Sequence, residues 1–288
     1  MSATDVILRS GNLEDAEACG QICHDAFADI AARHNFPKDL PSPEIASGHL
    51  SGILSHPGFY SVIAERDGKI AGSNFLDERG PIFGVGPITV DPRVQDSGIG
   101  RQLMLNVMQR SAERGAAGVR LLQDAFHNRS FVLYAKLGFQ MRDTTSVMQG
   151  PAIRMKIPGY SVREAMPPDL EACDSLCAAV HGHHRSGEVR DAITNHTALV
   201  VEHHGRLSGY TTSVGFVGHS VAETNEELKA LISATPEYQG SGFHVPNSNG
   251  EMLRWCYDNG LRMVKAMTLM SVGLYNEPKG AYLPSVLY

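Results

Sequence analysis

The chain has 288 residues, of which 42% are hydrophobic and 19% are charged, and its formal net charge is −6. This length fits one large domain or two domains of about 150 residues each. The acidic balance argues against nucleic acid as a partner of the surface as a whole, and no apolar run reaches the roughly 18 residues of a membrane span.

The first half alternates predicted strands and helices, which indicates an α/β fold with a mixed central sheet. Strands are predicted at residues 6–9, 83–91, 118–125 and 139–148, a β-hairpin at 60–78, and helices at 13–33, 44–54, 98–114 and 130–137. Helix 98–114 has the clearest pattern, because its apolar residues recur at helical spacing and Gly115 follows its end.

A glycine-rich turn, Gln95-Asp96-Ser97-Gly98-Ile99-Gly100-Arg101, leads into that helix. The start of a helix presents unpaired N–H groups and partial positive charge, and glycines let an anion approach them closely. Arg101 adds charged donors, so the turn suits a pyrophosphate. It is neither a Walker loop, because no Gly-Lys-Ser/Thr follows, nor a dinucleotide-binding loop, because Leu103 stands at the third glycine position.

These residues, after Val90-Asp91-Pro92, resemble the acetyl-CoA pyrophosphate loop of the GNAT superfamily of N-acetyltransferases. The segment "HNRSFVLYAKLGF" at 127–139 resembles the second motif of that family, Asn-x-x-Ala-x-x-x-Tyr-x-Lys-Leu-Gly-Phe. Tyr134 stands at the tyrosine position, whereas His127 and Ser130 replace the asparagine and the alanine. The resemblance covers the first half of the chain.

The resemblance implies acetyl-CoA as co-substrate and direct attack of an amine on its thioester. It implies backbone N–H groups near Val90 that stabilise the oxyanion, and Tyr134 as the acid that protonates the leaving thiolate. The alternative for Tyr134 is a buried aromatic of its helix. The implied cofactor-binding residues are Ile88, Thr89, Val90, Gln95, Asp96, Ser97, Gly98, Ile99, Gly100, Arg101, His127, Asn128, Ser130 and Tyr134.

The general base is harder to assign, because residues 80–90 contain no Asp or Glu. Asp77 and Glu78, at the end of the preceding predicted strand, are the nearest carboxylates. The alternatives are that both belong to a solvated strand end, and that a water chain or a residue of the second half takes the proton.

The second half repeats the opening of the first. "ILRSGNLEDAEACGQIC" at 7–23 aligns with "SVREAMPPDLEACDSLC" at 161–177, and "VIAERDGKIAGS" at 62–73 aligns with "LVVEHHGRLSGY" at 199–210. Two tandem GNAT-like domains are therefore predicted, at residues 1–152 and 158–288. The repeated cysteine pairs, Cys19 with Cys23 and Cys173 with Cys177, are predicted to be buried core residues and not metal ligands.

The cofactor motifs do not recur in the second half, which predicts a degenerate domain without cofactor binding. Pro246 lies at the same offset from Pro92 as the repeated cysteines, so "GFHVPNSNGEMLRW" at 242–255 is aligned with the cofactor strand, loop and helix. The alternative is that Asn247-Ser248-Asn249-Gly250 still binds an anion through backbone amides. A capping box predicts a helix at 224–232, and "HGHH" at 181–184 is predicted to be a solvated loop with no metal.

Two functions are compatible with these patterns. The first is an acetyl-CoA-dependent transferase that acetylates a small-molecule amine, and the second is a sensor or scaffold that binds a CoA ligand without turnover. We expect a cytoplasmic monomer in which the halves form an internal pseudo-dimer, with no nucleic acid, membrane or metal partner. The second half is expected to pack on the first and to close one side of the acceptor site.

Overall fold

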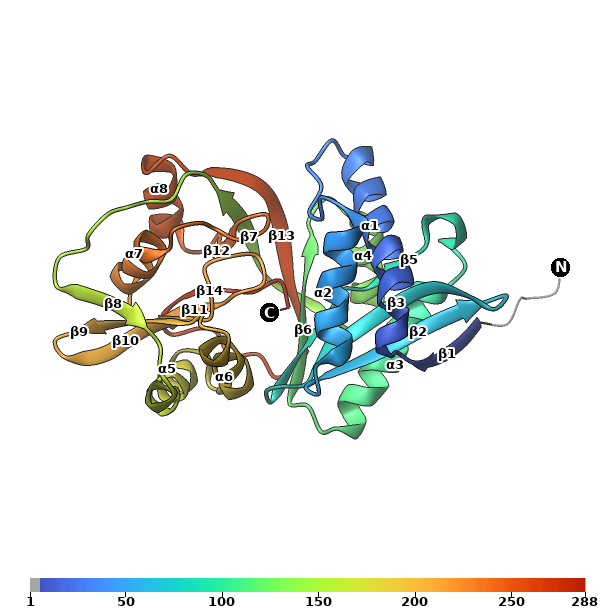
Figure 1. Ribbon diagram of the computed structural model, residues 1–288, viewed down its shortest axis with the longest axis horizontal. Helices are drawn as coiled ribbons and strands as arrows, with labels where there is room; N and C mark the ends of the chain where they lie inside the picture. The colour runs from blue at the N-terminus through green and yellow to red at the C-terminus, as the bar shows by residue number, and fades with distance from the viewer. Residues whose placement is uncertain (1–5, 288) are drawn as a thin grey trace.

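The computed structural model describes residues 6–287, which form a nine-stranded and a five-stranded sheet with helices against them. Figure 1 shows the two halves of the chain side by side, with β6 (Gly118–Asp124) and β13 (Arg262–Gly273) at their boundary. Within the described residues, none of the helices combines the length and the apolar character that a bilayer span requires.

The elements of the first half agree closely with the predicted ranges, because their apolar periodicity is strong. Asn12 caps a 3-10 turn that runs into the first helix, and Ser42 caps the second. The strands are β1 (Val6–Ser10), β2 (Phe59–Arg66), β3 (Lys69–Asp77), β4 (Ile82–Val85), β5 (Thr89–Val90), β6 and β7 (Gln140–Gln149), and the helices are α1 (Ala16–Arg33), α2 (Pro43–Ser55), α3 (Ile99–Glu113) and α4 (Asn128–Lys136).

The predicted strand 83–91 is broken. β4 ends at Val85 and β5 begins at Thr89, and Gly86, with φ of +139°, forms a cis peptide bond with Pro87 between them. Both segments pair with β3, but only β4 also pairs with β6, in parallel over Ile82–Gly84. The chain therefore turns away from β6 after Gly84.

The second half repeats the strand–helix–helix–hairpin order. Its elements are β8 (Tyr160–Glu164), α5 (Leu170–His181), α6 (Ser186–Thr194), β9 (Leu199–His203), β10 (Arg206–Thr211), β11 (Ser220–Ala222), α7 (Asn225–Ala234), β12 (Phe243–Pro246), α8 (Gly250–Asp258), β13 and β14 (Ala281–Leu283). The smaller sheet has the order β14-β11-β10-β9-β8.

One ion-pair arrangement occurs at the same place in both halves. Arg9 donates to both carboxylate oxygens of Asp15, at 2.8 and 2.7 Å, and its Nε donates to Glu65. Arg163 contacts Asp169 and Glu202 in the same way. The aligned residues thus repeat a contact as well as a pattern, which supports the duplication.

The halves exchange strands β7 and β13. The large sheet has the order β1-β2-β3-β4-β6-β13-β7-β12, so β13 of the second half lies between β6 and β7 of the first. In turn, β7 pairs with β12 of the second half. The apolar segment that contains β13 therefore completes the sheet of the first half.

This pairing corrects the alignment of Pro246 with Pro92. β12 pairs with β7 as β6 pairs with β13, and α8 follows β12 as α4 follows β6. The counterpart of the glycine turn is instead the short connection from β11 to α7. There, Thr224 and Glu227 form the predicted capping box.

All five cysteines are free and buried, so the predicted core role is confirmed. Within residues 6–287, no group of three or more His, Cys, Asp or Glu side chains is arranged to hold a metal ion. The largest apolar core lies between the first-half sheet and α3 with α4, and includes Leu103, Met104, Val107 and Leu121.

Candidate active site

The break between β4 and β5 opens a gap in the first-half sheet. Among the described residues, β5 pairs with β3 alone, through Val90 with Gly72 and Thr89 with Ser73. Its other edge faces the gap toward β6. Ile88, Thr89 and Val90 therefore lie along this gap, and the carbonyl of Val90 accepts a hydrogen bond from Gln95 at 3.2 Å.

The glycine turn follows β5 and enters α3. Asp96 and Gly98 have φ of +64° and +85°, and these left-handed conformations fold the turn tightly. Ser97 donates to the carbonyl of Val94 at 2.6 Å, but no side chain caps α3. The first N–H groups of this helix thus keep their capacity to bind an anion.

Positive groups surround the turn. Arg129, at the start of α4, donates to Asp96 and to Gln95, both at 3.2 Å. Burial lowers the pKa of His127, and the charges of Arg129, His34 and Arg33 lower it further, so these four groups lie near one another. Arg129 was not among the residues predicted from the sequence, although it lies inside the second motif. Nothing in the sequence indicated that the end of α1 lies near the start of α4.

Tyr134 lies on α4 and is 6% exposed. Its ring packs at 6.1 Å from that of Phe139, and burial together with the nearby Asp124 raises the pKa of its hydroxyl. The pair His127 and Ser130 shapes the start of α4, because Ser130 donates to the carbonyl of His127 and to Gln123, each at 2.9 Å. Asn128 is exposed at the first helical position.

Asp77 and Glu78 point to opposite faces of the sheet. Asp77 is paired in register with Gly84, and Gly84 with Arg120, so these three residues share one face. Glu78 instead contacts Arg110 of α3 at 2.7 Å and Arg114, the residue after α3, at 3.5 Å. The structure therefore separates the two carboxylates that sequence reasoning placed together.

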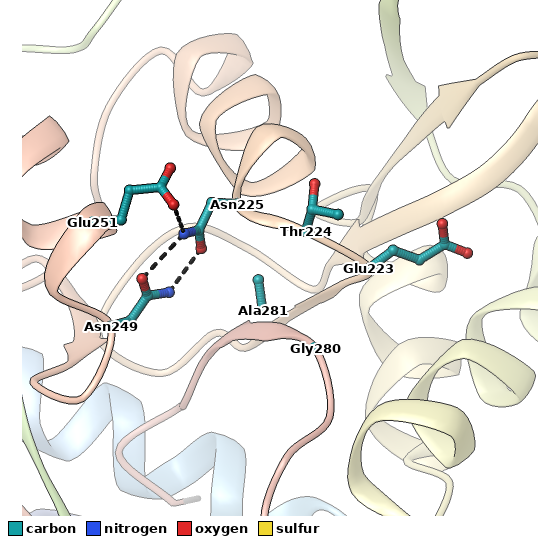
Figure 2. A pocket seen from close by; sticks show the side chains of 7 residues that line it. All are labelled: Glu223, Thr224, Asn225, Asn249, Glu251, Gly280 and Ala281. Atoms are coloured by element: carbon teal, nitrogen blue, oxygen red, sulfur yellow. Dashed lines mark hydrogen bonds between the residues drawn. The ribbon is translucent and has the colours of Figure 1, made fainter.

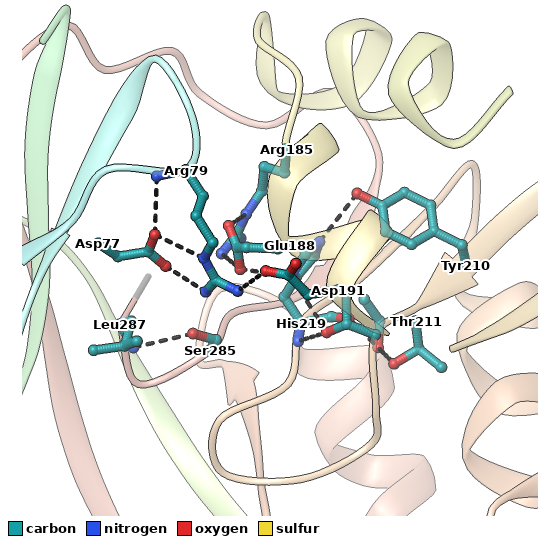
Figure 3. Close-up of polar contacts among 12 residues, drawn as sticks. Asp77, Arg79, Arg185, Glu188, Asp191, Tyr210, Thr211, His219, Ser285 and Leu287 are labelled. Carbon is teal, nitrogen blue, oxygen red and sulfur yellow. Dashed lines mark hydrogen bonds and ion pairs between the residues drawn. The ribbon is translucent and has the colours of Figure 1, made fainter. Parts of the chain in front are cut away.

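The face that carries Asp77 is covered by the second half, and Figure 3 shows the polar contacts there. Arg79 bridges Asp77, at 2.5 Å, and Asp191 of α6, at 2.7 Å. Arg185 and Glu188 form a buried ion pair at 2.7 Å, and His219 contacts Glu188 at 3.2 Å. Burial raises the pKa of Asp77, while Arg79 opposes that shift.

Two histidines of "HGHH" also belong to this interface, which corrects the predicted solvated loop. His181 is 2% exposed and His183 is 7% exposed. Burial lowers the pKa of both, to about 4 for His183. The polar pattern was misleading because these side chains are buried by segments that are distant in the sequence.

The segment 285–287 lies over the break in the sheet. A Cβ at Gly84 would overlap with the carbonyl oxygen of Leu287, and a Cβ at Gly86 would lie 3.7 Å from its side chain. Val286 donates to the carbonyl of Phe216 at 3.0 Å, and Leu287 donates to Ser285, as drawn in Figure 3. The second half therefore forms one wall beside the gap.

The counterpart of the turn in the second half is acidic. Figure 2 shows a shallow pocket between β11, α7 and α8, where Asn225 exchanges hydrogen bonds with Asn249 and donates to Glu251. Glu223 also lines it, and no glycine precedes α7. Nearby, Asn247 contacts Thr144 and Ser146, and Ser248 donates to Asp143, so these side chains are already engaged.

Comparison with known proteins relates the first half of the chain to acetyltransferases. Residues 57–141 match the family model described as the acetyltransferase (GNAT) domain. A mycothiol acetyltransferase of Kytococcus sedentarius is 27% identical over 142 residues, which cover 49% of this chain and 46% of that protein. The match thus spans about half the length of this curated relative.

Solved structures resemble the whole chain. One from Pyrococcus horikoshii, described as an acetyltransferase, has a TM-score of 0.75 at 15% identity and covers 96% of this chain and 94% of its own. A tandem GNAT protein from the clavulanic acid biosynthesis pathway has a TM-score of 0.58 at 15% identity, with coverages of 93% and 98%. At such identities these likenesses show the fold alone.

Taken with the two motifs, these matches confirm the resemblance and the fold of two tandem GNAT-like halves. The first half thus carries, at residues 57–141, a segment that matches the acetyltransferase (GNAT) domain.

Proposed function

We propose that the chain transfers an acetyl group from acetyl-CoA, bound by the first half, to a small-molecule amine. The observation that carries this proposal is the uncapped start of α3, which follows β5, and β5 pairs with β3 but leaves a gap toward β6. N–H groups, Arg101 and Arg129 there suit the pyrophosphate. The edge of β5 at Ile88, Thr89 and Val90 suits the amides of the pantetheine arm.

In the reaction, the amine nitrogen forms a bond to the thioester carbonyl carbon, and the carbon–sulfur bond then breaks. A backbone N–H group near Val90 stabilises the oxyanion, and Tyr134 donates its proton to the leaving sulfur. The buried environment of Tyr134 keeps its hydroxyl protonated, as an acid requires. The amine loses one proton to a base, which releases it to solvent, and the tyrosinate regains one proton from solvent, so the net products are the amide and the free CoA thiol.

The acceptor reaches the thioester from the face that carries Asp77, between the two halves. Asp77 is our proposed base, in preference to Glu78, because Glu78 points to the other face and contacts α3. Arg79 holds the carboxylate of Asp77 in place. Burial raises the pKa of Asp77, which brings it closer to the pKa of an amine than the pKa of a solvated carboxylate is.

Calorimetric titration with acetyl-CoA, followed by detection of free CoA thiol with a panel of amines, tests this proposal. The acceptor of mycothiol acetyltransferase belongs in the panel because of the partial likeness. We expect one bound acetyl-CoA per chain and amine-dependent thiol release. Binding without release for every amine would favour the alternative, a CoA-ligand sensor, and failure to bind would refute both.

A further inference from the structure

A buried lysine of the second half joins two carboxylates of the first. Lys265, on β13, is 3% exposed, and its Nζ lies 2.5 Å from Asp39 Oδ2 and 2.6 Å from Asp124 Oδ1. Asp124 ends β6, whereas Asp39 lies in the connection 34–42 between α1 and α2. Lys265 thus links this connection to the central sheet.

Further contacts anchor the same connection. Ser241, also from the second half, donates to the other oxygen of Asp39 at 2.9 Å. The ring of Phe36 stacks on Phe126 at 4.3 Å, and that of His34 lies 5.1 Å from it. The connection is therefore held at its beginning by the turn after β6 and at Asp39 by the second half.

These anchors lie beside the cofactor gap. The connection begins at the end of α1, where His34 and Arg33 approach His127 at the start of α4. It reaches the carboxyl end of β6 at Asp124, whose charge acts on Tyr134. Asp124 also shares a face with Arg120, which is the face from which we propose that the acceptor enters.

The charges explain why Lys265 decides the position of Asp39. A buried ammonium needs a partner, and two carboxylates that approach one another repel unless a cation lies between them. Lys265 satisfies both requirements at once. Without it, Asp39 has no cationic partner at this place and is repelled by Asp124.

We propose that Lys265 is a positioning residue through which the second half holds the connection 34–42 against the cofactor gap of the first. This inference rests on the proposed function for its catalytic consequence, but the anchoring itself does not. The second half thereby contributes to the active site a side chain that no cofactor motif contains.

Hydrogen exchange of the full-length chain, followed by mass spectrometry, tests the anchoring. In Lys265→Met, which keeps the length of the side chain without its charge, amides of 34–42 should exchange about 10- to 100-fold faster. The matched control is Lys229→Met, because Lys229 also bridges two carboxylates, Glu226 and Glu251, but does so away from the connection. It should leave exchange in 34–42 unchanged.

Asp39→Asn gives a second test that leaves the pair of Lys265 and Asp124 intact, and it covers the case in which Lys265→Met does not fold. It should also accelerate exchange in 34–42. Lys265→Arg, which keeps the charge, should restore most of the protection. Unchanged exchange in 34–42 for a folded Lys265→Met or for Asp39→Asn would overturn the proposal.

Acetyl-CoA itself is the probe for the functional consequence. In the natural chain it should protect 34–42 further, and this added protection should be smaller in Lys265→Met. With an active amine from the panel, Lys265→Met should raise KM more than it lowers kcat. If the natural chain does not bind acetyl-CoA, the proposed function fails, whereas the exchange rates without ligand still decide the anchoring.

Discussion

Arg79 donates from Nη1 to Asp191 Oδ2 at 2.7 Å, so the end of β3 in the first half is tied to α6 in the second. The same guanidinium holds Asp77, which is 6% exposed. Removal of Arg79 would leave a buried carboxylate without its cation. We expect Arg79→Met to lower the free energy of unfolding by about 3 kcal/mol, as for other broken buried ion pairs, measured by urea denaturation.

The control for this prediction is Arg206→Met, because the pair of Arg206 with Glu223 is exposed. Exposed pairs contribute about 0–1 kcal/mol. Equal effects of the two substitutions would contradict the buried link between the halves.

Gly100→Glu should abolish acetyl-CoA binding. A Cβ at Gly100 meets Leu133 and Val90 only at 3.8 Å, so Gly100→Ala should fold and bind normally. A carboxylate there would repel the pyrophosphate, and we expect affinity to fall about 100-fold or more. Calorimetry measures both variants. Gly250→Glu, at the start of α8, is the control in the second half, and a loss of binding there would contradict a site confined to the first.

Tyr134→Phe should lower kcat about 100- to 10,000-fold, the usual contribution of a general acid, with little change in the affinity for acetyl-CoA. Because burial and Asp124 raise the pKa of Tyr134, its titration should not limit kcat between neutral pH and about pH 10. A pH–rate profile on the best amine measures this. Full activity of the phenylalanine variant would reduce Tyr134 to a packing residue.

The buried His219 should make stability depend on pH. Burial, together with Arg185, lowers its pKa from 6.5 to about 4. The unfolded chain therefore binds more protons than the folded chain between these values, so this contribution is complete above pH 6.5 and is lost as the pH falls toward 4. The loss is about 3 kcal/mol for a shift of this size.

His219→Gln removes that titration and keeps a polar side chain. Urea denaturation at several pH values should give a shallower fall in stability for this variant than for the natural chain. His196→Gln, on an exposed residue, is the control. Identical slopes for His219→Gln and the natural chain would show that another group carries the pH dependence.

A fragment of residues 1–152 should not form a soluble folded monomer. β13 pairs with β6 over Gly118–Asp124 and with β7 over Gln140–Gln149, so its absence leaves two strand edges unpaired. Unpaired edges promote aggregation. Co-expression of residues 158–288 should restore a soluble complex on size-exclusion chromatography. A monomeric fragment with native acetyl-CoA affinity would mean that β7 can pair with β6 directly.

The sequence alone determined the local elements and the candidate cofactor turn. Helix 98–114 and hairpin 60–78 were predictable because each follows from periodicity and turn residues within a short window. The repeated Arg9 and Arg163 were also visible, since each contacts an aspartate six positions later in its own half. Such contacts need no knowledge of distant segments.

Only the tertiary structure decided which strand lies beside β6, which histidines are buried, and what holds the connection 34–42. Alternation of apolar residues says that the strand near 262–273 has a buried face, but it does not name the neighbour to which its N–H and C=O groups bond. For the same reason Pro246 was aligned with the wrong turn, and Lys265 carried no signal. Its two partners come from other parts of the chain, and only the exchange of strands brings the three charges together.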